Sequence, residues 1–276
     1  IVSERAGNDV TKVARYCEQD GRLLELKVYR KGQAAAPLQQ LVYEYDPVGN
    51  ILSLSDLVQP TQWHSNARID AISRYQYDTL YQLIQASGRE NSANTGGQKF
   101  PTAVQFGATD RGLWRNYTQH YAYDAAGNLT RLRHVPSSGT GYTREMQVAA
   151  FSNRAVPAVQ GRQVQWDEAF DANGNQLSLD GVQQAVWDVR NQLTYTTQVQ
   201  REKGDPDVES YLYDSQGRRA LKVRSREART KPYTQGTYYL PGLQVHKQST
   251  QRFNVLDIDT GGGRVTVVQW ESGKPR

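Results

Sequence analysis

The pattern of hydrophobic and polar positions along the chain predicts strands rather than helices. Residues 264–270 (Arg-Val-Thr-Val-Val-Gln-Trp) are the strongest strand prediction, because β-branched and aromatic residues favour extended backbone. No segment carries a long apolar period of 3.6 residues, which an amphipathic helix requires. The chain is therefore expected to be all-β, with short helices only at residues 76–85 and 146–150.

A short phrase returns along the sequence. Two aromatic residues separated by one position precede Asp, two variable residues, Gly or Asn, and then a leucine. The copies centre on Asp46, Asp78, Asp124, Asp171, Asp188 and Asp214. Such self-similarity predicts an array of similar units. The uneven spacing of the copies does not fit a strict solenoid or propeller and favours one large sheet with loops of varying length.

Each copy predicts a β-hairpin. Aromatic residues two positions apart leave a strand on the same face. The Asp side chain can accept a backbone N–H two residues on, and the Gly or Asn takes the positive φ of a tight turn. One hairpin cannot bury its aromatic face alone, but a row of hairpins can. The repeat residues expected to build the sheet are Tyr43, Tyr45, Asp46, Gly49, Tyr75, Tyr77, Asp78, Tyr121, Tyr123, Asp124, Gly127, Asp171, Gly174, Trp187, Asp188, Tyr211, Tyr213, Asp214 and Gly217.

The segments between the copies predict turns and connections. A turn at Asp20-Gly21 introduces a further hairpin at residues 22–29, which resembles a degenerate copy of the repeat. Residues 88–112 and 135–162 are rich in Gly, Ser, Asn, Thr or Pro and predict irregular connections, and residues 203–207 predict a polar hairpin tip. No composition break marks a domain boundary, so residues 1–276 are expected to form a single segment.

Composition favours a thin wall over a dense globule. The chain has 17 Tyr but only one Met and one Cys, and its mean hydropathy is −0.74. A single sheet with one face on modest apolar packing requires less Leu, Ile and Phe than a solid core. Cys17 is alone, which excludes an intrachain disulfide and a cysteine metal site. The chain begins at Ile1 without Met or a signal peptide, so we expect a fragment of something longer.

The net charge of +5 does not indicate nucleic-acid binding, because no recognition motif accompanies it. Lys222, Arg224 and Arg226 alternate in the densest basic stretch and would share one face of a strand. The simplest interpretation is a solvated strand face, and the alternative is a patch that faces an acidic partner or cargo.

Motifs of enzymes and metal sites are incomplete in this chain. Asp259-Thr260-Gly261 matches the tripeptide of aspartic proteases, but those enzymes need a second carboxylate and no second copy is present. The spacing of Asp257 and Asp259 begins like a calcium loop but lacks the later ligands. Both are expected to be parts of a hairpin turn. We expect no catalytic residue, no metal ligand and no cofactor.

The repeat resembles the tyrosine–aspartate repeat of Rhs proteins. Three further phrases are similar to the C component of bacterial insecticidal toxin complexes, in the same order: residues 74–90, residues 238–243 (Tyr-Tyr-Leu-Pro-Gly-Leu) and residues 270–275 (Trp-Glu-Ser-Gly-Lys-Pro). The resemblance implies a spiralling strip of antiparallel β-hairpins that forms part of a hollow shell. In this family a segment after Gly-Lys-Pro cuts the toxin domain free, and the present sequence ends before it.

The resemblance also implies a function and partners. The C component pairs with a B component, and the shell holds a C-terminal toxin domain in an unfolded state. A pentameric A component, reached through B, delivers that domain, so neither direct membrane insertion nor catalysis is expected of this chain. The implied setting is a secreted or cell-surface bacterial toxin complex. Two alternatives remain: a surface adhesin or carbohydrate-binding module that stacks sugars on the tyrosines, and an aspartic protease that uses Asp259.

Overall fold

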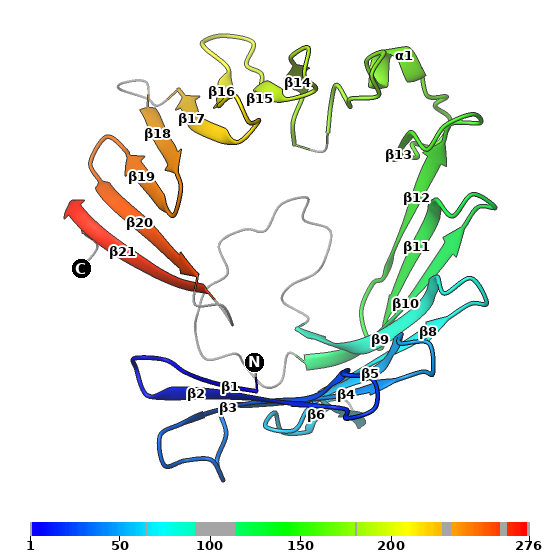
Figure 1. Ribbon diagram of the computed structural model, residues 1–276. Coiled ribbons are helices and arrows are strands. Elements are labelled where there is room, and N and C mark those ends of the chain that lie inside the picture. The colour runs from blue at the N-terminus through cyan, green and yellow to red at the C-terminus, as the bar shows by residue number, and fades with distance from the viewer. Residues whose placement is uncertain are drawn as a thin grey trace. The chain divides into compact units, whose positions relative to one another are not determined.

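The chain is built from antiparallel strands, as its sequence pattern predicts (Figure 1). The computed structural model describes residues 2–64, 66–91, 114–179, 181–227, 233–259 and 264–274. Contacts divide the chain into two compact units, Ile1–Arg162 and Gln163–Arg276. That both belong to one repeat segment without an internal domain boundary stays a prediction.

The first unit contains an 11-stranded sheet and a separate hairpin among its described residues. The strands are β1 (Ser3–Arg5), β2 (Val10–Tyr16), β3 (Leu23–Arg30), β4 (Gln39–Tyr45), β5 (Ile51–Asp56), β6 (Gln62–His64), β7 (Ala67–Ile69), β8 (Ile72–Tyr77), β9 (Leu83–Asn91), β10 (Trp114–Tyr123), β11 (Leu129–Pro136), β12 (Tyr142–Val148) and β13 (Ala155–Pro157). Strands β1–β5 and β8–β13 lie side by side in chain order (Figure 1). The β6–β7 hairpin is inserted between the neighbours β5 and β8. Sequential hairpins thus build the sheet without crossovers.

The second unit contains an eight-stranded sheet, also in chain order. Its elements are α1 (Trp166–Ala169), β14 (Gln184–Trp187), β15 (Leu193–Val199), β16 (Asp207–Tyr213), β17 (Arg219–Arg226), β18 (Tyr233–Leu240), β19 (Leu243–Lys247), β20 (Arg252–Asp259) and β21 (Arg264–Ser272). Each neighbouring pair is antiparallel. None of the described helices is long and apolar enough to cross a membrane.

Several local predictions are confirmed. The turn at Asp20-Gly21 joins β2 to β3, the polar tip at residues 203–207 joins β15 to β16, and residues 264–270 lie in β21. The hairpin prediction at each described repeat turn that joins two strands is also confirmed, because β4–β5, β8–β9, β10–β11, β14–β15 and β16–β17 all pair antiparallel. Local turn chemistry was therefore a sufficient guide to these elements.

The two predicted short helices are wrong. Within residues 76–85 the chain finishes β8, turns at Asp78 and begins β9, and residues 146–148 complete β12. Short apolar runs fit either period, and here the turn at Asp78 and the strand partners decide the outcome. The irregular connection at 135–162 contains β12 and β13, so that prediction is also wrong in part. Residues 88–91 belong to β9, and the rest of the predicted 88–112 loop lies outside the described residues.

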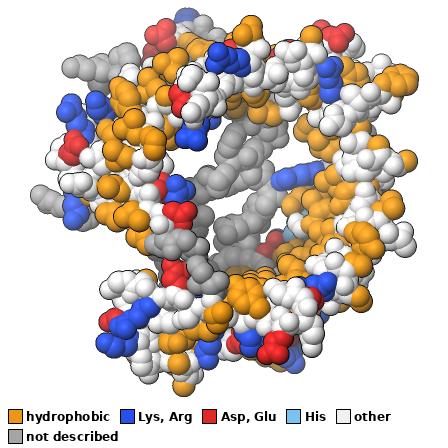
Figure 2. Space-filling model, in the orientation of Figure 1, with side chains coloured by type: hydrophobic (Ala, Val, Ile, Leu, Met, Phe, Trp, Pro, Cys, Tyr) orange, Lys and Arg blue, Asp and Glu red, His pale blue; other side chains and the backbone are white. Residues whose placement is uncertain are grey.

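Little apolar surface is fully buried. The buried apolar residues of the described chain are Ala14, Ile69, Ala86, Phe170, Ala185 and Tyr211. Larger apolar side chains such as Leu212, at 62% exposure, stay open to solvent, and Figure 2 shows hydrophobic side chains at the surface over the strands. This burial pattern agrees with the thin sheet that the low hydropathy predicts.

Candidate functional site

The six repeat turns share one backbone geometry. In each, the N–H of the Asp donates to the carbonyl four residues on at 2.8–3.0 Å, and the N–H three residues on donates to the Asp carbonyl at 3.0–3.2 Å. The turns begin at Asp46, Asp78, Asp124, Asp171, Asp188 and Asp214. The degenerate copy at Cys17 closes the same way with one extra residue, through Cys17 N–H to the Arg22 carbonyl at 2.8 Å. The same five-residue loop therefore ends hairpin after hairpin.

The Asp carboxylate organises this loop. Its Oδ1 accepts the N–H four residues on in all six turns, at 2.8–2.9 Å. In five turns Oδ1 also accepts the N–H two residues on, as predicted, at 2.8–3.0 Å. In the Asp46 turn Oδ1 accepts instead from Gly49 N–H at 2.7 Å. A single side chain thus satisfies two backbone donors that the tight loop leaves unpaired.

Asparagine at the fourth position stabilises the charged form of the Asp. The Nδ2 groups of Asn128 and Asn175 donate to Asp124 and Asp171, and these side-chain hydrogen bonds lower the pKa of both carboxyls. At Asp46, burial raises the pKa, but the hydrogen bonds from Asn50 and the turn outweigh it, so the net shift is downward.

The residue three positions after the Asp is left-handed in every turn. The glycines there have φ between 79° and 108°: Gly49, Gly127, Gly174 and Gly217. Asn191 takes the same conformation at φ 59°, as the Gly-or-Asn pattern predicts. Tyr81, at φ 62°, does not follow the predicted pattern. Its side chain is exposed, so the loop admits a large residue where nothing crowds it.

Consecutive turns also touch. The guanidinium of Arg22 donates to the carbonyls of Asp46 and Pro47 at 2.7 and 2.8 Å. Gln192 lies so close to the next turn that a β-carbon on Gly217 would come within 2.9 Å of its Nε2. Glycine is therefore required at position 217 both for its positive φ and for this close approach.

The second aromatic residue of each repeat binds the preceding hairpin. Its ring O–H or N–H donates to a backbone carbonyl on the return strand of that hairpin, an interaction we name the aromatic clasp. The five clasps are Tyr45 to Leu23 at 2.8 Å, Tyr77 to Ile51 at 3.1 Å, Tyr123 to Leu83 at 2.9 Å, Trp187 to Gln176 at 2.9 Å and Tyr213 to Leu193 at 2.8 Å. Phe170 holds the equivalent position in its repeat and has no polar atom to donate.

The clasp solves a pairing problem at the end of each hairpin. The ladder between β5 and β8 begins at Ser53, so the Ile51 carbonyl lies beyond its end. A carbonyl in a partly buried position costs free energy unless a donor reaches it, and the Tyr77 hydroxyl is that donor. Burial raises the pKa of Tyr45, Tyr77 and Tyr123, which keeps these hydroxyls protonated as donors. The clasps therefore extend the contact between hairpins past the strand ladders.

The first aromatic residue serves the face of the sheet. The rings of Tyr43 and Tyr45 stack with centroids 6.4 Å apart, which confirms that the pair shares a face. The Tyr211 hydroxyl donates to Glu209 at 2.7 Å. Burial and then this hydrogen bond raise the pKa of Tyr211 to about 12. The paired repeat tyrosines are buried or half-buried, which does not favour the sugar-stacking surface of the adhesin alternative.

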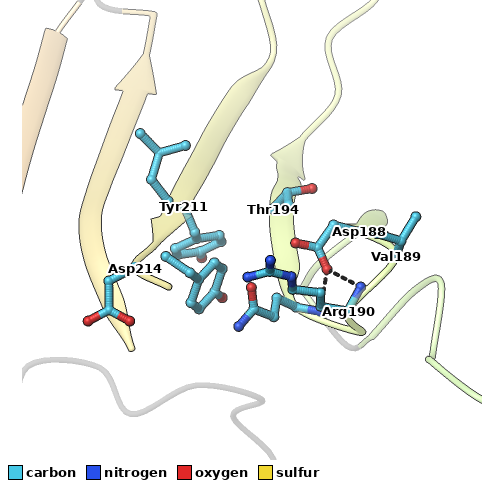
Figure 3. A pocket seen from close by; sticks show the side chains of 9 residues that line it. Asp188, Val189, Arg190, Thr194, Tyr211 and Asp214 are labelled. Carbon is cyan, nitrogen blue, oxygen red and sulfur yellow. Dashed lines mark hydrogen bonds between the residues drawn. The ribbon is translucent and has the colours of Figure 1, made fainter. Parts of the chain in front are cut away.

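A cavity of about 230 Å³ lies between two consecutive turns of the second unit. Figure 3 shows Tyr211 between Asp188 and Asp214, with the Asp188 carboxylate bound to the backbone of its own loop. Ligand sites for small molecules are larger, about 300–1,000 Å³. The carboxylate of Asp188 is already engaged, so the cavity follows from the spacing of the repeats and supplies no free reactive group.

The other candidate residues contribute to the sheet. Lys222 and Arg224 lie 3.9 and 3.8 Å from the buried Glu209 carboxylate, so the basic face is partly neutralised within the sheet and is not simply solvated. Asp259 pairs with Arg264 at the ends of β20 and β21, and residues 260–263 lie outside the described part. No group of three metal-ligating side chains gathers among the described residues.

Comparison with known proteins identifies the repeat. The family model of the tripartite Tc toxins repeat matches residues 139–182. The toxin subunits YenC2 and YenC1 of Yersinia entomophaga are 36% and 33% identical over 99% of this chain. The chain belongs to the Tc toxin repeat family. It spans 29% of the length of each of these two toxin subunits.

Solved structures agree with this membership. In the crystal structure of TcdB2-TccC3-TEV a chain with 36% identity matches all of this chain with a TM-score of 0.88, over 13% of its own length. The structure of TcdB2-TccC3 without its hypervariable C-terminal region matches 99% of this chain at 37% identity, also with a TM-score of 0.88, over 13% of its length. The Tc holotoxin pore of Photorhabdus luminescens matches 99% with a TM-score of 0.86. The Tc repeat fold of the chain is thus shared with subunits of assembled toxins.

Sequence reasoning located the Tc repeats but not the clasps. The acceptor carbonyl lies in the preceding copy, 22 to 40 residues away in the tyrosine clasps. The only signal was that a ring with a polar donor precedes the Asp in most copies. The buried cluster of Glu90, Arg115 and His134 was also missed, because its members come from three different strands.

Proposed function

We propose that this chain is a wall segment of a toxin-encapsulating shell and that it sequesters an unfolded C-terminal cytotoxic domain before delivery. The observation that carries the proposal is the row of hairpins joined by ladders, stacked turns and clasps. Such a row forms a continuous sheet with few openings and no assembled reactive site among its described residues. Similarity to toxin subunits over 99% of the chain supports it.

Confinement is the mechanism of the proposed wall. An enclosed polypeptide has too little volume to fold and is kept from acting on the producer. The wall needs only to stay closed, so its important residues are the repeat tyrosines and the Asp and Gly of the turns. In this proposal the chain has no catalytic activity of its own and holds no cofactor.

The proposed partners follow from the assemblies in which related chains occur. Chains with the same fold occur in TcdB2-TccC3 and in a Tc holotoxin pore. We infer that this chain pairs with a B component and, through B, reaches a pentameric A component. The proposed setting is a secreted or cell-surface toxin complex.

Electron microscopy of the longer protein with its C-terminal region attached tests the wall proposal. We expect a hollow particle with weak interior density. A matched sample in which Tyr45, Tyr77, Tyr123 and Tyr213 are all changed to Phe should show leaky or broken walls, because every tyrosine clasp is lost. A solid or extended particle with exposed tyrosines would refute encapsulation and favour the adhesin alternative.

A further inference from the structure

A buried polar cluster lies in the first unit, away from the repeat turns. Arg115 and His134 are only 6% and 5% exposed. Arg115 Nε is 2.8 Å from Glu90 Oε1, and His134 Nε2 is 3.1 Å from the same oxygen. Arg115 also donates to the Ser138 carbonyl. One carboxylate thus balances one guanidinium, and the histidine adjoins both.

Aromatic rings enclose the histidine. The His134 ring lies between Tyr117 and Tyr142, with centroids 5.2 and 4.8 Å away. This packing removes water from both faces of the imidazole. The titratable and charged groups around His134 are Glu90 from β9, Arg115, Tyr117 and Tyr121 from β10, Tyr142 and Arg144 from β12 and, beyond Tyr117, Tyr75 from β8.

The hydrogen bonds define where the imidazole proton lies. Tyr121 O–H donates to Gln119 Oε1 at 2.7 Å, which orients the Gln119 amide nitrogen toward His134 Nδ1, 3.3 Å away. His134 Nδ1 therefore accepts a hydrogen bond, and Nε2 carries the proton toward Glu90. Every polar atom in this chain of groups is satisfied only when His134 is neutral.

We propose that this cluster is an acid-sensitive lock that holds β9–β12 together when His134 is neutral and loosens them when it is protonated. A second proton would place an N–H at Nδ1 directly opposite the N–H of Gln119. The Glu90 charge is already shared with Arg115, so the cluster would become net positive in a buried position.

Relief of the proton clash reaches a repeat. Gln119 can accept from a protonated His134 only by turning its amide, and Tyr121 then loses the acceptor of its hydroxyl. Tyr121 is the first aromatic of the repeat whose Tyr123 clasps Leu83. Acidification would thus weaken the contact between the β8–β9 and β10–β11 hairpins. This inference concerns the sheet itself and does not depend on what the proposed shell encloses.

Hydrogen–deuterium exchange of the full chain tests the lock. A single linked proton changes an opening equilibrium by at most about tenfold per pH unit. After correction for intrinsic exchange, we expect β10–β12 to open about tenfold more often at pH 5.5 than at pH 6.5. The His134→Phe variant keeps a stacking ring without a titratable group and should lose this response. His120→Phe is the matched control, because His120 is exposed on the same strand, and it should keep the response.

Two results overturn the lock. Protection of β10–β12 that does not change with pH in the wild-type chain would exclude it, as would an unchanged response in His134→Phe. If His134→Phe fails to fold, ¹⁵N NMR of histidine-labelled wild-type chain decides at pH 7.5. A neutral ring protonated at Nε2 supports the proposal, and a ring protonated at Nδ1 or at both nitrogens refutes it.

Discussion

At the scale of single residues, function depends on backbone positions that few side chains can occupy. The repeat turn needs one left-handed residue and one carboxylate, and it repeats this demand in six places. The aromatic clasp needs one ring with a polar donor. Each demand is local and specific, so single substitutions test it directly.

Gly127→Val should destabilise the chain by more than about 1 kcal/mol, because a β-branched residue is strained at the φ of 83° observed there. Its β-carbon would also approach Gln82 Nε2 to 3.1 Å. Urea denaturation of the whole chain measures the loss. Gly127→Asn is the matched control, since Asn191 occupies the same position in another turn, and it should cost clearly less. Equal losses for the two variants would show that the left-handed φ does not decide the stability of this turn.

Tyr123→Phe should lower the free energy of unfolding by about 1 kcal/mol, because it leaves the Leu83 carbonyl without its donor. The ring and its packing remain, so the loss reports the clasp alone. Tyr43→Phe is the control: it removes a hydroxyl for which the described residues provide no hydrogen bond, and it should change stability by less than about 0.5 kcal/mol. Similar losses in both variants would argue against the clasp as a stabilising contact.

At the scale of elements, the hairpin turns make stability depend on acid. The pKa values of Asp46, Asp124 and Asp171 are lowered from 3.8 in the folded chain. Their contribution is therefore complete at pH values above the unfolded pKa and is lost as the pH falls through the lower folded pKa. We expect the urea midpoint to decrease as the pH is lowered from 5 to 2.5.

The Asn128→Ala variant tests the source of this acid dependence. Without the Asn128 amide, the pKa of Asp124 should return toward its ordinary value, so less stability should be lost on acidification. NMR titration of the Asp124 carboxyl measures that pKa directly. An unchanged titration in the variant would mean that the backbone hydrogen bonds alone hold the carboxylate.

At the scale of the whole molecule, the two faces of the second unit's sheet differ. The strand register places Glu209, Lys222 and Thr237 on the face of the repeat tyrosines. Opposite them lie exposed apolar residues, among them Leu212, Tyr238, Ile258, Val265 and Val267. β21 forms the end of this sheet among the described residues, so one edge of its backbone is open to pairing.

Val267→Lys should reduce self-association of the chain, because it places a charge on the apolar face of the edge strand. Sedimentation velocity at rising concentration measures the effect. Val268→Lys is the matched control: this residue is as exposed but lies on the opposite face of β21. If both variants reduce association equally, the open edge rather than the apolar face drives it.

The sequence by itself determined the local structure of this protein. Asp, Gly and paired aromatics specify each turn and the face of each ring, because these preferences involve only a few neighbouring residues. The resemblance of ordered phrases to a toxin component also needed only the sequence, and the comparisons confirm it. The failed helix at residues 76–85 shows the limit, because a short apolar run fits two periods until its strand partners are known.

Only the tertiary structure decided what joins one hairpin to the next. Tyr123 finds the Leu83 carbonyl across 40 residues of chain, and Glu90, Arg115 and His134 meet from three strands. Neither contact leaves a local pattern, because each depends on strand register rather than on spacing. The repeat phrase therefore predicted the units of the sheet, while the register between them created the clasps and the buried cluster.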